Sequence, residues 1–212
     1  MIRIENQSVT GIRAAIRGMR NPLNSWDQSD SFTENDVFFH DEVGEKDKAL
    51  MMKLVSAGTD HRKFLRFIHC SFDLVAPLYW WKEFDTYKVG TAVNSCSTMH
   101  TIHKRDFTLD DFSHEHLFGT TENILIQLIE ILNRYRGMYE NDKLLDREEK
   151  KQVWWQMIQL LPTSYNQRRT VDLNYEVLRN IYHARKGHKL DEWRDLCKWI
   201  ETLPCSYLIT EG

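Results

Sequence analysis

The sequence is poor in the features that mark several common protein classes. It has only four cysteines, Cys70, Cys96, Cys197 and Cys205, and none of them form a Cys-x-x-Cys pair. This scatter argues against a zinc ribbon or a disulfide framework and is typical of a reducing compartment. No apolar run approaches the roughly 20 residues that cross a bilayer, and Met1–Glu5 lacks the pattern of a signal peptide. We therefore expect a cytoplasmic protein with no membrane partner.

Net positive charge is also missing. The sequence has 28 Lys and Arg against 31 Asp and Glu, which gives a formal net charge of −3. Nonspecific nucleic-acid binders carry a basic surplus, so we expect no nucleic-acid partner. Only 4 prolines and 9 glycines interrupt the 212 residues, and 42% of the residues are hydrophobic. This length and composition predict a single folded domain over residues 1–212.

Most of the chain shows the periodicity of amphipathic helices. Apolar residues recur every three or four positions and predict helices over 12–19, 45–57, 78–84, 120–136, 147–161, 174–185 and 190–203. Alternation predicts strands over 2–4 and 61–76. The polar, turn-rich stretch over 22–45 predicts a long loop. The fold class that follows is α+β, a mostly helical domain with a small sheet.

The first stretch that carries chemistry follows the short aromatic helix over 78–84. Lys88 leads into Gly90 and then into small amide and hydroxyl side chains, among them Asn94 and Ser97. A glycine among such residues lets backbone N–H groups come close to an anion. The alternative is a capped helix start that binds no ligand, and the residue types alone favour that alternative.

The second such stretch begins at Leu161-Pro162. Arg168 and Arg169 follow, and a predicted helix then carries Asn174, Asn180 and Arg185. Arginine is the preferred partner of phosphate because its planar fork donates two parallel hydrogen bonds. Isolated arginines are more often plain surface charges, so this stretch also has a structural alternative.

Two histidine pairs, His100-x-x-His103 and His114-x-His116, raise the question of a metal. Neutral imidazoles are good zinc ligands. The segment between the pairs is charged and loop-like, however, and no Cys or Glu spacing matches a zinc pattern. We expect no metal site.

The order of these signals resembles the flavin-dependent thymidylate synthase family over roughly residues 46–195. The residues that carry the resemblance are, in chain order, Gly58 to His61, Ala76-Pro77, Trp80-Trp81, Asn94, Ser97, Leu161-Pro162, Asn174, Leu178, Asn180, Arg185 and Trp193. The spacing from Pro162 to Arg185 matches best. The resemblance implies an oligomeric α+β domain of the flavin-dependent thymidylate synthase type.

The family's signature is altered in this chain. Its Arg-His-Arg falls on Thr86-Tyr87-Lys88, which keeps one cation at most, and one extra residue follows near Gly90. The signature glutamate is Ser95, and the closing Arg-Tyr is Met99-His100. An arginine that precedes Leu-Pro in the family falls on Ile158. Such losses weaken the grip on a phosphate dianion, so the resemblance implies the fold more directly than the reaction.

The function that the resemblance implies is that of a flavoprotein. In the family a homotetramer binds FAD, and flavin reduced with NADPH passes a one-carbon unit from methylenetetrahydrofolate to C5 of dUMP. The implied cofactor-binding residues are His61, Lys88, Asn94, Asn174 and Asn180. The implied nucleotide-binding residues are Ser97, Arg168, Arg169 and Arg185. No catalytic residue is assigned, because the family uses no cysteine nucleophile and the cofactor carries the chemistry.

Two alternatives to an enzyme stay open. With its altered signature, the same scaffold could sequester a nucleotide signal without turning it over. The many aromatic residues could instead serve only an oligomer interface. Flavin colour with NADPH-dependent turnover would indicate the enzyme, and nucleotide binding without flavin would indicate the sequestering protein.

Overall fold

The structure is a computed structural model that describes residues 2–31 and 43–211. The chain divides into two compact units. The first unit is Met1–Arg3, Leu74–Thr86 and Asn94–Arg169, and the second is Ile4–Asp73, Tyr87–Val93 and Thr170–Gly212. The expectation of one domain over 1–212 stays a prediction.

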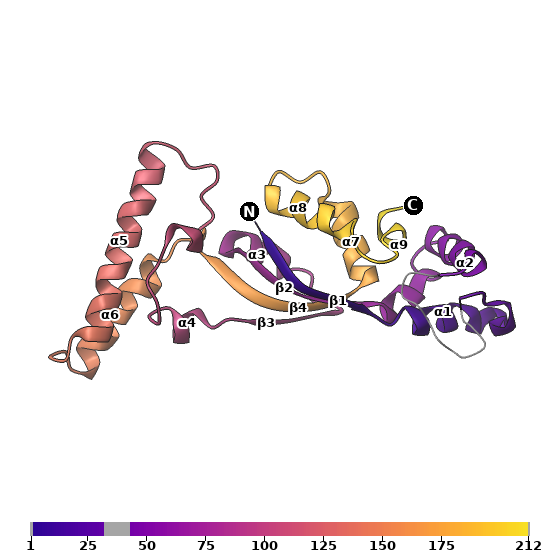
Figure 1. Cartoon of the computed structure of the whole chain (residues 1–212), viewed down its shortest axis with the longest axis horizontal. Coiled ribbons are helices and arrows are strands. Elements are labelled where there is room, and N and C mark those ends of the chain that lie inside the picture. Colours follow the sequence, from indigo (N-terminus) through magenta and orange to yellow (C-terminus); the bar gives the residue numbers. More distant parts are fainter. Residues whose placement is uncertain (1, 32–42, 212) are drawn as a thin grey trace. The chain divides into compact units, whose positions relative to one another are not determined.

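The strands form a four-stranded sheet with the order β1-β2-β4-β3 (Figure 1). Its strands are β1 (Arg3–Thr10), β2 (His69–Pro77), β3 (Thr91–Ser95) and β4 (Asn166–Asn174). Side-chain hydrogen bonds join His69 to Asp172 at 3.0 Å and Thr170 to Asp73 at 2.6 Å. Numbers rise along β2 as they fall along β4, so these two strands are antiparallel.

Strand β2 shows why part of the predicted strand over 61–76 is wrong. Its inward side chains alternate, and Cys70, Phe72 and Leu74 are buried. Residues Arg62–Phe67 instead form a short 3-10 helix, η3. Neighbouring Phe64 and Leu65 are both buried there, which a strand with one buried face does not allow.

The predicted helices are confirmed. They are α1 (Ile12–Arg20), α2 (Glu45–Ser56), α3 (Leu78–Phe84), α5 (Thr120–Asn141), α6 (Arg147–Leu160), α7 (Tyr175–Arg185) and α8 (Asp191–Ile200). None of the helices within 2–31 and 43–211 is long and apolar enough to cross a membrane. The α+β class, mostly helical with a small sheet, is therefore the class observed.

The sequence does not predict β3, β4 or the one-turn helix α9 (Tyr207–Thr210). Its pattern over 94–102 suits either a helix or a loop, and the one-turn helix α4 (Thr98–Thr101) forms there. Of the predicted loop over 22–45, the part at 32–42 lies outside the described residues. The part before it forms two 3-10 turns, η1 (Asn21–Leu23) and η2 (Trp26–Gln28). Another 3-10 turn, η4 (Leu109–Asp111), lies in the first unit.

Two aromatic clusters hold the first unit together. Helices α5 and α6 lie side by side (Figure 1), and Leu132 and Met157 pack there with Phe112. In α3, Trp80 and Trp81 are fully buried, and their ring centroids are 5.1 Å apart. Both tryptophans therefore belong to the core of this unit.

In the second unit, α1 begins directly against the end of η3. Gly11 has φ +89°, and a Cβ there would lie 1.9 Å from the carbonyl oxygen of Phe67. At the other end of α1, buried Arg20 donates from Nε to Asp47 on α2 at 2.6 Å. Asp47 also accepts the hydroxyl of Ser29 at 2.6 Å. These contacts fix both ends of α1.

Replacing Gly11 with alanine should destabilise the protein, because a Cβ meets backbone and a positive φ is costly for alanine. We expect the free energy of unfolding to fall by about 2–5 kcal/mol. Gly187→Ala is the control, since no atom lies within 4 Å of its Cβ position, and it should change that free energy by less than about 1 kcal/mol. Chemical denaturation measures both, and equal stability of the two variants would contradict the close approach at Gly11.

Candidate functional site

The segment Tyr87–Gly90 is anchored to helix α7 at both of its ends. A Cβ on Gly90 would lie 2.9 Å from Nδ2 of Asn174 and 3.3 Å from the side chain of Val177, at the start of α7. At the end of α7, Nε of Arg185 donates to the hydroxyl of Tyr87 at 3.0 Å. Gly90 has φ +76° and no side chain, so the segment rests directly on the helix. Two stretches that are far apart in sequence thus come together.

Asn174 has a fixed orientation at the start of α7. It is buried, and its Oδ1 accepts the backbone N–H of Val177 at 3.1 Å, which makes it the N-cap of the helix. Its Nδ2 is the atom that Gly90 approaches. The expected cofactor residue therefore has a second role, because it caps the helix as well.

The other expected cofactor residues lie on exposed positions. Lys88 belongs to the anchored segment, and Asn180 follows Val177 by three residues, one turn further along the same side of α7. His61 immediately precedes η3, whose Arg62 bonds Glu176 of α7 at 3.0 Å. The second unit thus holds His61, Lys88, Asn174 and Asn180, and Asn94 belongs to the first unit.

Arg185 lies in an aromatic environment. Its guanidinium carbon is 4.6 Å from the ring centroid of Trp193 on α8 and 5.8 Å from that of Tyr87. Trp193 is fully buried. A cation over the face of an indole is attracted by the ring's quadrupole. The expected nucleotide-binding arginine is therefore held by groups of its own unit.

The two neighbouring arginines of β4 face opposite sides of their strand. The guanidinium carbon of Arg169 is 4.2 Å from the ring centroid of Trp81, and its Nη1 donates to Asp85 at 2.7 Å. Arg168 is exposed and lines a cavity of about 210 Å³ with Cys96 and Thr98. Successive side chains alternate along a strand, so Arg168 is the arginine that faces this cavity.

Ser97, in the first unit, stands in sequence between Cys96 and Thr98, which line the same cavity. It is exposed and directly precedes helix α4, and the backbone N–H of the adjacent Cys96 donates to the carbonyl of Arg168 at 2.9 Å. Ser97 and Arg168 are therefore near neighbours. Arg169 instead bonds to Asp85 and lies over the ring of Trp81.

Two of the cysteines are poor nucleophiles in this structure. Burial raises the pKa of the Cys70 thiol to about 12 and that of Cys197 to about 11. A thiol must lose its proton to attack, so both are inert at neutral pH.

The histidine pairs have structural neighbours. The ring centroid of His103 is 4.8 Å from that of Tyr139, and Nδ1 of His114 lies 2.8 Å from the carbonyl oxygen of Phe112. In the part of the chain that the structure describes, no three His, Cys, Asp or Glu side chains are arranged to hold a metal.

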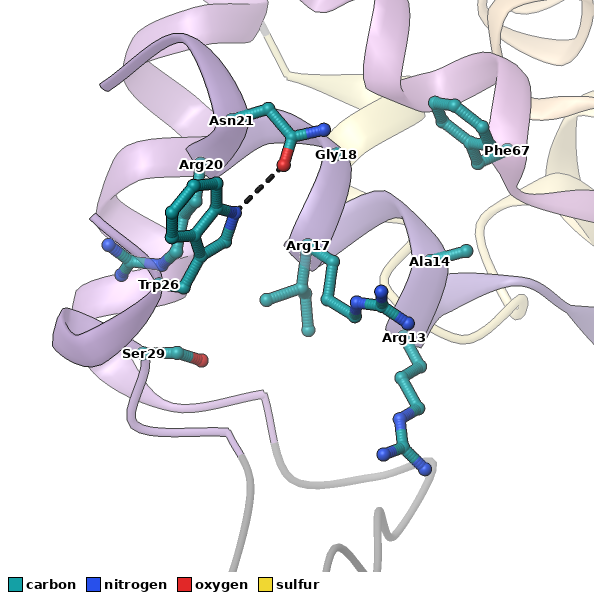
Figure 2. A pocket seen from close by; sticks show the side chains of 10 residues that line it. Arg13, Ala14, Arg17, Gly18, Arg20, Asn21, Trp26, Ser29 and Phe67 are labelled. Atoms are coloured by element: carbon teal, nitrogen blue, oxygen red, sulfur yellow. Dashed lines mark hydrogen bonds between the residues drawn. The ribbon is translucent and has the colours of Figure 1, made fainter. Parts of the chain in front are cut away.

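Sequence reasoning missed a cavity beside α1, which Figure 2 shows from close by. Its volume is about 710 Å³, within the usual range for ligand pockets. Arg13 and Arg17 lie one turn apart on α1, and Trp26 and Phe67, each 52% exposed, add flat rings. The i, i+4 arginines followed by a tryptophan were the available signal, but neither stands in a known motif.

The rings of this cavity are held in place. Nε1 of Trp26 donates to Oδ1 of Asn21 at 2.8 Å, the dashed line in Figure 2. The ring of Phe67 rests on α1 where Gly18 has no side chain, 3.2 Å from the Cβ position. Among the described lining residues there is no Asp or Glu. Arg20 of the lining is paired with Asp47, which lies on α2. The cavity suits a planar, anionic ligand.

The comparisons with known proteins found matches to the structure but none to the sequence. No protein-family model matches the sequence, and no curated protein matches it. The structure matches Thymidylate Synthase X from Helicobacter pylori, solved with FAD and dUMP, with a TM-score of 0.69 and 16% identity over 99% of this chain and 97% of that one. The fold is that of a flavin-dependent thymidylate synthase.

A second structure agrees. The flavin-dependent thymidylate synthase ThyX from Helicobacter pylori, complexed with FAD and dUMP, matches with a TM-score of 0.68 and 17% identity over 98% of this chain and 97% of that one. The resemblance expected from the sequence is thus confirmed at the level of the fold. Because the match spans almost the whole of each chain, it includes the α5–α6 pair as well as α7 and its surroundings.

Proposed function

We propose that the protein is a divergent flavin-dependent thymidylate synthase that binds FAD and transfers a one-carbon unit from methylenetetrahydrofolate to C5 of dUMP, with NADPH as reductant. The observation that carries the proposal is the fold match over 99% of the chain to a protein solved with FAD and dUMP. Fold alone does not define activity, so the residues must also suit these ligands.

The second unit suits the flavin cofactor. The side-chain amide of Asn174 and the N-terminus of the 11-residue helix α7 offer N–H donors close together. Lys88, two residues before Gly90, would add positive charge. His61 and Asn180 would add contacts to the flavin. Asn94, which belongs to the first unit, stays a proposed cofactor residue. Bound flavin would supply the redox and one-carbon chemistry, and these side chains would bind and orient it.

The cavity beside α1 suits the adenylate half of the same cofactor. Phe67 precedes Ile68, whose carbonyl accepts the backbone N–H of Tyr175 at the start of α7 at 2.9 Å. The cavity wall therefore adjoins the Asn174 end of α7. Arg13 and Arg17 would face phosphate, and Trp26 would stack on a flat base.

For the nucleotide, Arg185 is the main phosphate donor in this proposal. Its guanidinium is already oriented by Tyr87 and Trp193. Ser97 and Arg168, which belong to the first unit, stay proposed nucleotide-binding residues. Arg169 would act indirectly, through its bonds within that unit. Charge-assisted bonds from a planar guanidinium are the strongest that a phosphate receives from side chains.

Self-association as a cytoplasmic homotetramer is part of the proposal. Helix α5 carries a second apolar row on its outer side, in which Ile124, Ile131 and Met138 recur every seven residues and are 57%, 38% and 37% exposed. A seven-residue repeat of apolar side chains is typical of helices that pack against another helix. This row supports a contact with a second copy of the chain.

A nucleotide-sequestering protein on the same scaffold is the second candidate. The observation that favours it is the replacement of the family's Arg-His-Arg by Thr86-Tyr87-Lys88. That protein would bind a nucleotide through Arg185 without taking up flavin, so FAD binding distinguishes the two candidates.

The first test is FAD uptake. Purified protein mixed with FAD should retain visible flavin absorption after gel filtration. Arg17→Glu should lower the affinity for FAD by about tenfold or more, because it puts a carboxylate beside the phosphates. Its affinity for riboflavin, which lacks the adenylate half, should change less than about twofold.

Arg134→Glu on α5 is the matched control, since it makes the same change at an exposed position in the other unit. A wild-type protein that stays colourless would overturn the proposed function. Equal FAD affinity of the wild type and Arg17→Glu would remove only the α1 cavity from the cofactor site.

The second test is dUMP binding by Arg185→Ala. Loss of a charge-assisted contact to phosphate should weaken dUMP binding by about 10- to 100-fold. The free energy of unfolding should fall by less than about 1 kcal/mol, because Trp193 keeps its other neighbours. Calorimetric titration and thermal melting measure the two effects. If melting collapses while the folded fraction binds dUMP normally, Arg185 has a structural role only.

A further inference from the structure

The hydroxyl of Tyr87 occupies one particular nitrogen of Arg185. The bond runs from Nε of Arg185 to Oη of Tyr87 at 3.0 Å. A guanidinium can grip an anion side-on, with Nε and one terminal nitrogen, or end-on, with Nη1 and Nη2. With Nε directed at Tyr87, any two-point grip on an anion must use the end-on pair. The bond therefore selects one binding geometry.

The ring of Trp193 fixes the plane from which that grip is made. The guanidinium carbon lies 4.6 Å from the ring centroid, and the fully buried indole cannot move aside easily. The Tyr87 ring meets the Trp193 ring edge-on, with centroids 6.0 Å apart. The tyrosine thus touches both the cation and the ring beneath it.

The short link between α7 and α8 keeps Trp193 in register with Arg185. Nη1 of Arg194 donates to the carbonyls of His188 and Lys189 at 2.7 and 2.9 Å. The N–H of Leu190 donates to Nδ1 of His188 at 3.2 Å. These bonds tie the link to the first turn of α8, where Trp193 lies.

We propose that Tyr87 and Trp193 are positioning residues that aim the end-on face of Arg185 at a phosphate, so that Tyr87 determines the preference for a phosphorylated over an unphosphorylated ligand. Tyr87 accepts from Nε of Arg185 through a lone pair of its hydroxyl oxygen. The inference rests on the proposed function, because it concerns the nucleotide-binding arginine of that proposal. It assigns Tyr87, which stands in place of the family's histidine, a role of its own.

The test is Tyr87→Phe, which removes the hydroxyl and keeps the ring. Its affinity for dUMP should fall by about tenfold, because Arg185 loses its fixed direction. Its affinity for deoxyuridine, which has no phosphate, should stay within about twofold. The NMR signal of the Arg185 Nε–H group should be protected from solvent exchange in the wild type and lose that protection in Tyr87→Phe.

Tyr182→Phe is the matched control. Tyr182 is also on α7, and its hydroxyl donates to Oε1 of Glu201 at 2.8 Å, away from Arg185. A general effect of losing a tyrosine hydroxyl would appear in both variants. We expect Tyr182→Phe to leave both affinities and the Arg185 signal unchanged.

Three results would overturn the inference: dUMP affinity in Tyr87→Phe equal to the wild type, equal losses for dUMP and deoxyuridine, or an Arg185 signal that does not change. Failure of the proposed function gives a different result, since the wild type then binds no dUMP. In that case inorganic phosphate is the probe. A phosphate-dependent shift of the Arg185 signal that Tyr87→Phe abolishes supports the inference, and its absence in the wild type overturns it.

Discussion

The close approach of Gly90 to Asn174 is the contact on which the candidate site of the second unit depends. A side chain at position 90 would meet Nδ2 of Asn174 at 2.9 Å, so only a glycine lets the backbone lie on the start of α7. Lys88 lies two residues before this contact, in the segment that the contact anchors. In the same segment, Tyr87 bonds Arg185 at the opposite end of α7. Because Gly90 has no side chain, the segment Tyr87–Gly90 can lie against helix α7, which is far from it in sequence.

Much of the fold could be predicted from the sequence, because helices such as α1 and α8 show their buried stripe directly. Strand β4 could not, since Asn166–Thr170 is polar and only Val171 and Leu173 show buried alternation. The strand is held by its neighbours in the sheet, which local patterns do not record. For the same reason η3 was read as a strand, because its apolar residues pack on α1 and α7.

The candidate site was predictable in part. Residue type and order placed Arg185, Asn174 and Lys88 among the binding residues, and the structure gathers all three on α7 and the segment beside it. The different environments of Arg168 and Arg169 follow from strand alternation, which appears only once β4 is known. The α1 cavity was hidden because its arginines and rings come from three separate elements and form no motif.

The most direct test of this account is FAD uptake by Gly90→Ala beside the wild type, at a temperature where both are folded. The account predicts that the wild type takes up flavin and that Gly90→Ala binds it at least about tenfold more weakly, because a side chain at position 90 lifts the backbone there from α7. Equal uptake by both proteins would contradict the dependence of the site on this contact. No uptake by either would contradict the flavin site itself.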